Sequence, residues 1–331
     1  LNVAVGYGAL GSNTTALGNV AVGYNALTAN TTGTGNVAMG YGALDASTTA
    51  SFSVAIGYNA LTANTTGDTN VGIGTNALST NNIGGSNVAI GRDAGIANTS
   101  GSYNIAIGRQ ALNSNTTASN NTAVGYQAGY SNTTGLVTAV GYRALRSNTT
   151  GNTHTAVGYD ALTANTTGSD STAVGGFALR ANTTGSRNVS MGYTSLYSNV
   201  TGNNNTALGS GALYANTASG NTAVGRNAAF ANTSGYGNTA VGKEALASNT
   251  TGLNNTAVGD SALDANTTAN NNVAMGTAAL GVNTTGDQNT AVGTFALDAN
   301  TTANNNTAVG YQAGTSNTTG TWLTAFGTQA G

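Results

Sequence analysis

The sequence predicts an all-β fold, a parallel β-solenoid of about 20 coils built on a 17-residue repeat. The repeat runs along the whole chain, and its clearest copy is residues 19–35, NVAVGYNALTANTTGTG. Each copy begins with residues that alternate large, small and large before a constant glycine, which is the pattern of a short strand. Each copy continues into an Asn-Thr-Thr-Gly segment, which is typical of a turn. A short fixed period of this kind is characteristic of solenoids, in which each coil contacts only its neighbours.

One glycine in every copy, the anchor glycine, defines the repeat, and positions within a coil are counted from it. Successive anchors keep the same spacing except at two steps that are one residue shorter, Gly125 to Gly141 and Gly209 to Gly225. We expect residues 1–331 to form a single continuous array with a truncated last copy. Neither end resembles the cap that a solenoid needs, so we expect this chain to be a segment of a longer protein. The 20 anchors are Gly6, Gly23, Gly40, Gly57, Gly74, Gly91, Gly108, Gly125, Gly141, Gly158, Gly175, Gly192, Gly209, Gly225, Gly242, Gly259, Gly276, Gly293, Gly310 and Gly327.

The composition points away from several classes of protein. Charged residues make up 5% of the chain and the net charge is −2, so we expect no nucleic-acid partner and no attraction to an anionic membrane. Because the chain has no Cys, it has no disulfide framework and no thiol chemistry. No apolar run is long enough to insert into a membrane, and no signal peptide is visible.

Three positions are expected to form the dry interior of each coil. Position −3 is β-branched in all 20 copies, position −1 is large and apolar in all 20, and position +4 is Leu in 15 of 20. Val20, Val22 and Leu27 are the examples in the clearest copy. Burial of such side chains stabilises a fold by roughly 1.5–3 kcal/mol each.

Alanine is almost constant at two further positions, −2 in 18 of 20 copies and +3 in 19 of 20. If positions −3 and −1 point inward, position −2 must point outward. An outward position that stays small and apolar indicates close packing against something else. We expect a second copy of the chain in a closed symmetric oligomer; an additional layer within the same chain is the alternative.

The charged residues mark the positions that are expected to face water. All 18 lie at +1, +2, +5, +11 or +12. Charged groups are rarely buried without a partner, so these positions are expected to face water. Tyr occupies +1 in nine copies and is expected to form a partly exposed ladder. Asn occupies −4 in 15 of 20 copies and +7 in 18 of 19, and stacking would align these amides into ladders.

No catalytic, cofactor-binding or metal site is predicted. The only His, His154, stands at the ladder position −4 in place of Asn, and is interpreted as a turn residue. The carboxylates do not cluster in pairs, which argues against the acid–base chemistry of two carboxyl groups. The phosphate-binding loop and the calcium-binding nonapeptide are both absent. We therefore expect the segment not to be an enzyme and to need no cofactor.

The turn segment contains a recurrent Asn-x-Ser/Thr motif, which in a secreted protein is an acceptor for Asn-linked sugar. The alternative is that Asn-Thr-Thr-Gly serves only as a turn, without any sugar. Sugars linked to the threonines are a further alternative. The 16 candidate glycosylation sites are Asn13, Asn30, Asn64, Asn98, Asn115, Asn132, Asn148, Asn165, Asn182, Asn199, Asn232, Asn249, Asn266, Asn283, Asn300 and Asn317.

The strand motif resembles the head repeat of trimeric autotransporter adhesins, and similar arrays occur in fibre proteins of phages and large viruses. The motif stands here as NVAIGRDA in residues 87–94, NIAIGRQA in 104–111 and NTAVGYQA in 121–128. The resemblance implies a left-handed β-roll, a homotrimer packed through the Ala-bearing strands, and a surface-projecting role. The repeat of that family is usually shorter, and the additional residues here coincide with the Asn-Thr-Thr-Gly bend.

Three functions are consistent with these patterns. The first is a non-catalytic extracellular fibre, filament or stalk on a cell or virion surface, with end-to-end filaments as a further form of self-association. The second is an adhesin or receptor-binding head that contacts a host cell or matrix, with Arg143, Arg146, Arg180 and Arg187 as its candidate patch. The third is an ice-binding solenoid, suggested by the stacked Thr residues, although the paired Thr are expected in a bend rather than on a flat strand.

Overall fold

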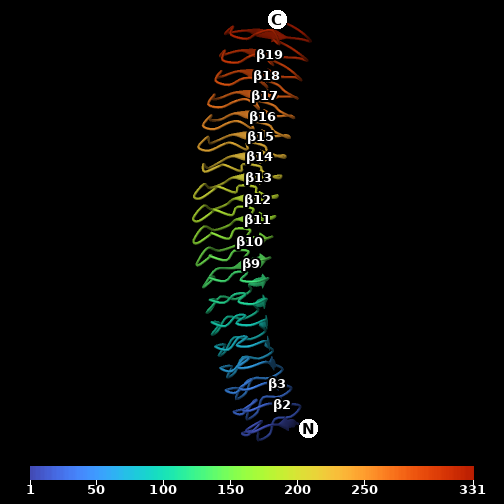
Figure 1. The fold of residues 1–331 in the computed structure, drawn as a ribbon, viewed down its shortest axis with the longest axis vertical. Helices are drawn as coiled ribbons and strands as arrows, with labels where there is room; N and C mark the ends of the chain where they lie inside the picture. The colour runs from blue at the N-terminus through green and yellow to red at the C-terminus, as the bar shows by residue number, and fades with distance from the viewer. The chain divides into compact units, whose positions relative to one another are not determined.

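The computed structural model describes residues 1–331 and consists of short strands joined by turns and bends, without any helix. It therefore has no helix that is long and apolar enough to cross a membrane. The chain divides into two compact units, Leu1–Thr167 and Gly168–Gly331, and each unit is described by itself. In each unit the coils stack in sequence order, so that every strand lies beside the strand of the next coil (Figure 1).

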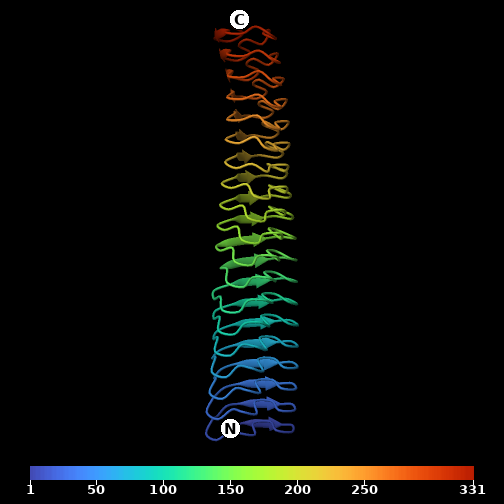
Figure 2. The same ribbon diagram turned by 90° about the vertical axis from the view of Figure 1, so that its left-hand side faces the viewer.

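Each coil contributes one strand of three or four residues, and Figure 2 shows the strands of the first unit running in the same direction. In the first unit the strands are β1 (Val3–Val5), β2 (Val20–Val22), β3 (Val37–Met39), β4 (Val54–Ile56), β5 (Val71–Ile73), β6 (Val88–Ile90), β7 (Ile105–Ile107), β8 (Thr122–Val124), β9 (Val137–Val140) and β10 (His154–Val157). In the second unit they are β11 (Thr172–Val174), β12 (Val189–Met191), β13 (Thr206–Leu208), β14 (Thr222–Val224), β15 (Thr239–Val241), β16 (Thr256–Val258), β17 (Val273–Met275), β18 (Thr290–Val292), β19 (Thr307–Val309) and β20 (Thr324–Phe326).

Neighbouring strands pair in parallel, and equivalent positions of the repeat stand side by side. In β2 and β3, for example, Val20 pairs with Val37 and Ala21 pairs with Ala38. The shorter step between β13 and β14 keeps this register, since Thr206 pairs with Thr222. The predicted parallel β-solenoid is thus confirmed, and one coil corresponds to one copy of the repeat.

The side of the strand that faces the interior was predicted wrongly. In β2 the middle residue, Ala21, is fully buried, whereas Val20 and Val22 lie half-exposed on the outside. The same pattern holds in the other strands that stack on both sides, so positions −3 and −1 point outward and position −2 points inward. The prediction for position +4 is confirmed, because Leu27 is 0% exposed.

The narrowness of the coil explains why alanine faces inward. The alanines at −2 and +3, such as Ala21 and Ala26, are both fully buried in a single chain. Even a methyl group added at Gly72, which occupies position −2, would lie 3.1 Å from the Cγ atom of Leu61. The interior has room for Leu at one position only. The alanine row therefore is not an exposed face, and the expectation that it packs against another copy of the chain is wrong.

Two ladders of asparagines form as the sequence predicts, but they are buried in the interior rather than placed in exposed turns. At position −4, the Asn19 Oδ1 atom accepts a hydrogen bond from the backbone N–H of Asn36 at 2.9 Å, and its Nδ2 atom donates to the Gly33 carbonyl at 2.9 Å. At position +7, the Asn81 Nδ2 atom donates to Asn64 Oδ1 at 2.9 Å and to the Gly84 carbonyl at 2.8 Å. These bonds satisfy buried polar groups and join each coil to the next.

The turn after each strand explains why the anchor must be glycine. Gly23 has φ of 140°, a region that side chains disfavour, and a Cβ atom added there would lie 2.4 Å from the carbonyl oxygen of Gly40. The turn then uses the left-handed region twice, at Asn25 with φ of 53° and at Leu27 with φ of 55°. Left-handed Leu is uncommon; here the conformation directs each Leu side chain into the interior.

Candidate functional site

The outer face of the strands carries two parallel rows of uncharged side chains, the outer rows, at positions −3 and −1. Position −1 is large and apolar in every coil, and its side chains are exposed or half-exposed, as with Ile56 and Ile90 in the first unit. Position −3 is Val or Ile in β1–β7 and mostly Thr afterwards. No charged residue occurs in either row. Contiguous apolar surface of this kind is typical of an interaction surface.

A ladder of stacked tyrosines runs beside the outer rows at position +1. Tyr7, Tyr24, Tyr41 and Tyr58 stack on successive coils with ring centroids 5.1–5.3 Å apart. All four are exposed, which confirms the predicted ladder. Because each ring face is covered by the next ring, the ladder presents ring edges and hydroxyl groups to the solvent.

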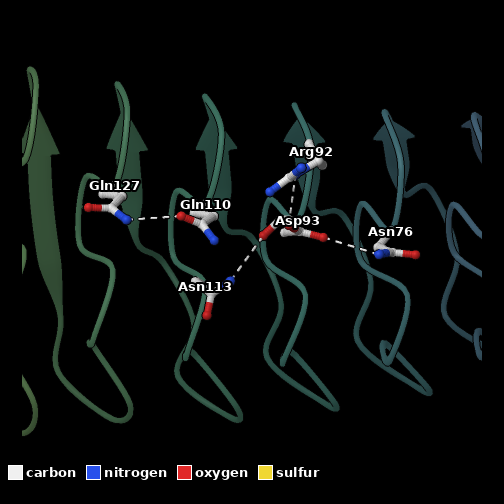
Figure 3. Close-up of polar contacts among 6 residues, drawn as sticks. All are labelled: Asn76, Arg92, Asp93, Gln110, Asn113 and Gln127. Carbon is white, nitrogen blue, oxygen red and sulfur yellow. Dashed lines mark hydrogen bonds and ion pairs between the residues drawn. The ribbon is translucent and has the colours of Figure 1, made fainter.

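Farther along the first unit, the row at position +2 becomes a run of polar side chains (Figure 3). The Asn76 Nδ2 atom donates to Asp93 Oδ1 at 3.1 Å, and Gln127 Nε2 donates to Gln110 Oε1 at 2.9 Å. Arg92 lies on the same coil as Asp93, with its Nε atom 3.2 Å from Asp93 Oδ2. The two amide contacts join neighbouring coils, and the Arg92–Asp93 pair adds one positive and one negative charge to the same surface.

The four arginines of the predicted adhesin patch are mostly engaged with their own unit. In the first unit, the Arg143 guanidinium donates to both carboxylate oxygens of Asp160 at 2.8 and 2.9 Å, and Arg146 Nε donates to Gln127 Oε1 at 2.9 Å. The hydrogen bond with Asp160, a side chain that is only 3% exposed, raises the pKa of Arg143.

In the second unit, Arg180 donates to the Tyr197 hydroxyl at 2.7 Å and lies over the Tyr197 ring, whereas Arg187 is exposed. The patch thus contains two arginines in each unit, and three of the four have partners within their own unit.

The candidate glycosylation sites lie inside the coils. Fourteen of the 16 asparagines are buried, and Asn13 and Asn317 are half-buried. Asn98 is representative: its Nδ2 atom donates to Asn81 Oδ1 at 2.7 Å and to the Gly101 carbonyl at 2.9 Å. A sugar linked to such a nitrogen would displace these bonds. The structure gives the asparagines a role in the fold, and their glycosylation stays a prediction that this burial disfavours.

His154 is buried at the start of β10, and its Nε2 atom lies 3.2 Å from the Asn165 Nδ2 atom. The interpretation of His154 as a turn residue is thus wrong, because it lies in a strand and its ring contacts the asparagine at +7 of the same coil. No group of three or more His, Asp or Glu side chains is placed to hold a metal ion. A shallow hollow of about 210 Å³ lies where the coil before β9 is one residue shorter, and it is lined by Asn120, Leu136, Val137, Thr138, Thr153, His154 and Thr155.

Two carboxyl groups at position +5, those of Asp264 and Asp298, have a raised pKa. Partial burial raises the pKa of the Asp264 carboxyl above the usual value, and the negative charges of Glu244 and Asp298 add to the shift. Partial burial also raises the pKa of Asp298. These carboxyls do not belong to a group of three or more side chains that could hold a metal ion. Partial burial therefore accounts for the raised pKa values without a metal site.

The paired threonines lie in bends, as the sequence predicts. Thr31 and Thr32 lie in a bend, and Thr31 Oγ1 donates to the Thr48 carbonyl at 3.0 Å. The outer rows are a further regular exposed surface, which the sequence pattern had placed inside. The chain matches no protein-family model, and no curated protein matches it either.

Proposed function

We propose that this chain is a non-catalytic structural array, a fibre, filament or stalk that projects from the surface of a cell or virion. The observation that carries the proposal is the separation of roles within each coil. The inner alanines, leucines and asparagines make the same contacts in coil after coil, whereas the residue type changes from coil to coil at the outer positions +1 and +2. Such a design can be extended by adding coils without altering the contacts that hold each coil.

Removal of whole coils tests the fibre proposal. Deletion of residues 242–309 takes out four complete copies of the repeat and joins Val241 to Gly310 in register. With a spacing of about 4.8 Å per coil, the longest dimension measured by small-angle X-ray scattering should fall by about 19 Å. A duplication of the same residues should lengthen it by the same amount. An unchanged longest dimension in both variants would contradict the fibre proposal.

We further propose that copies of the chain associate through the outer rows, with a homotrimer as the favoured assembly. In the first unit, ten strands at about 4.8 Å and a face about 13 Å wide present about 600 Å² per copy. Two such faces bury about 1,200 Å², which lies at the lower limit for a specific interface. Identical faces without charge can approach each other without repulsion.

The mass in solution tests this assembly. Light scattering should give about three times the 32.2 kDa of one chain. The substitutions Ile56→Lys and Ile90→Lys place charges in the outer rows and should lower the mass to that of one chain. Thr66→Lys, in an exposed bend, is the matched control and should leave the mass unchanged. A mass of one chain for the unaltered protein at every concentration would refute the assembly.

An adhesin or receptor-binding head is the second candidate, supported by a run of exposed and half-exposed side chains at +1. Arg109 lies over the Tyr126 ring, and Tyr126, Tyr142 and Tyr159 stack in succession. The substitution Arg109→Ser should weaken binding to host cells or matrix, and so should Arg146→Ser. Arg143 is spared because it supports the fold through Asp160. Unchanged binding by both variants would exclude this surface.

A further inference from the structure

The two threonines of the Asn-Thr-Thr-Gly bend have different roles. The first, at position +8, joins coils: Thr31 Oγ1 donates to the Thr48 carbonyl at 3.0 Å, and Thr250 Oγ1 donates to the Thr267 carbonyl at 3.0 Å. The second, at position +9, is exposed, as with Thr32 and Thr251, and its hydroxyl makes no hydrogen bond within the chain. We call the side chains at +9 the hydroxyl row.

The fold itself does not require a hydroxyl at this position. Ile83 occupies +9 in one coil and is 59% exposed, so an apolar side chain is accommodated there. Nevertheless, +9 is Thr or Ser in 17 of the 19 coils that have a complete turn segment. Exposed position +1, by contrast, holds Tyr, Arg, Lys, Asp, Thr, Ser and Gly. The copies have therefore diverged where side chains are unconstrained, yet the hydroxyl at +9 has been kept.

The retained hydroxyl is not explained by the Asn-x-Ser/Thr motif to which it belongs. One coil has Ser47 in place of the asparagine at +7 and still keeps Thr49. Conversely, Asn81 and Asn216 are kept where +9 is not a hydroxyl residue, because the asparagines bond inside the coil. Asparagine and hydroxyl thus vary separately. The accessible nucleophilic atom in the folded bend is the threonine Oγ1, whereas the asparagine Nδ2 is enclosed.

We propose that the hydroxyl row is a series of acceptors for O-linked sugars. The donor is a nucleoside-diphosphate sugar, and a glycosyltransferase supplies the catalytic base. The Oγ atom attacks the anomeric carbon, the bond from that carbon to the diphosphate oxygen breaks, and the hydroxyl proton passes to the base. An O-glycosidic bond forms and the nucleoside diphosphate leaves, without any oxidation or reduction. The proposal goes beyond the fibre role and holds equally for a single chain.

The spacing of the coils limits the size of each sugar. Acceptors on neighbouring coils lie about 4.8 Å apart, the strand spacing of a stacked sheet. Branched glycans on adjacent coils would collide, so single sugars or short unbranched chains are expected. The acceptors next to a coil without a hydroxyl, such as Thr66 beside Ile83, have more room and should carry the longest chains.

Mass spectrometry of protein from its natural source tests the proposal. Peptides of this segment should exceed their polypeptide mass by multiples of a sugar residue, and mild alkaline β-elimination should remove the excess. Fragmentation that preserves glycosidic bonds should map the sugars to +9 and not to +8. An unmodified segment, sugars at +8, or sugars released only by an amidase that converts Asn to Asp would each overturn the proposal.

Substitutions in the source organism give a second test. The triple variant Thr251→Val, Thr268→Val and Thr285→Val should lose the sugars of three coils and keep its fold, as the presence of Ile83 indicates. The corresponding Ser variants should keep them. Thr277→Val alters an exposed threonine outside the row and is the matched control. If this control lowers the sugar content of its peptide, the acceptors are not confined to the hydroxyl row.

Discussion

Ser190 and Ser195 form a hydrogen-bonded pair inside the coil of β12, with their Oγ atoms 2.6 Å apart. They occupy positions −2 and +3, and this is the single coil in which both alanine positions hold serine. The Ser190 Oγ atom also lies 2.8 Å from the Ser195 carbonyl oxygen, and the Ser195 Oγ atom lies 3.0 Å from the Gly192 carbonyl oxygen. One hydroxyl therefore donates to its partner Oγ while the other donates to its carbonyl. The contact shows that the two alanine rows face each other across the interior.

This pair should behave cooperatively when it is altered. Ser190→Ala or Ser195→Ala alone should lower the free energy of unfolding by about 0.5–1.5 kcal/mol, because each removes the buried hydrogen bond between the two hydroxyls. The double variant restores the alanine pair of other coils and should be at least as stable as the unaltered protein. Denaturant unfolding measures the double-mutant cycle. Additive losses would show that the two hydroxyls do not stabilise each other.

Adding a leucine to a coil that lacks one at +4 should change the stability of the fold. Gly129 replaces Leu at +4, and a Cβ atom added there would lie 3.9 Å from Cγ2 of Val137, which replaces the next ladder asparagine. Gly129→Leu should therefore overpack the coil and cost about 1–3 kcal/mol of stability. Thermal unfolding of this variant provides the measurement.

Gly95→Leu is the matched control, because the next coil there keeps Asn104 in the ladder and not a bulky apolar residue. It should be tolerated better than Gly129→Leu. Equal losses in the two variants would mean that Val137 does not fill the space of the missing leucine.

The ion pair of the half-exposed Arg143 with the buried Asp160 should contribute more than an exposed pair. Arg143→Met leaves the Asp160 carboxylate buried without its bidentate partner and should destabilise by about 3–5 kcal/mol. Arg92→Met removes the pair with Asp93, in which the arginine side chain is 55% exposed, and should cost less than about 1 kcal/mol. Urea midpoints of both variants measure the difference, and similar small losses would contradict it.

The contribution of Asp264 and Asp298 to stability should fall as pH rises. Because the folded-state pKa of Asp264 is raised above the usual 3.8, the folded chain binds a proton more tightly than the unfolded chain. Stability from this group is full below the ordinary value and is lost as pH rises through the folded-state pKa. Asp298 acts in the same direction.

Asp264→Asn should therefore raise the unfolding midpoint at pH 7 and flatten its dependence on pH. Asp68→Asn, at an exposed position, is the control and should change neither. Melting curves from pH 3 to pH 7 provide the test. A midpoint that increases steadily over this range in the unaltered protein, without any change in Asp264→Asn, would contradict the raised pKa.

Much of the coil could be predicted from local pattern. The anchor glycines, the asparagine ladders and the stacked tyrosines depend on contacts between equivalent positions, and the fixed period brings those positions together. The positions that hold charged residues were likewise identified as surface positions. Asp160 is an exception, because it is buried and its charge is paired with Arg143. The difference between the hydroxyls at +8 and +9 could not be predicted, because both are threonine in the same bend.

The sequence by itself determined the parallel stack, the length of the coil and the partition of each strand into two sets of alternating residues. It did not determine which set faces inward, because alternation is the same for both choices. The tertiary structure decided this. The alanine rows represented by Ala21 and Ala26 face each other inside a narrow coil, and Leu27 fills the remaining space. A valine at either alanine position would not fit, so the larger Val20 and Val22 had to lie outside, where they form the surface proposed to bind other copies.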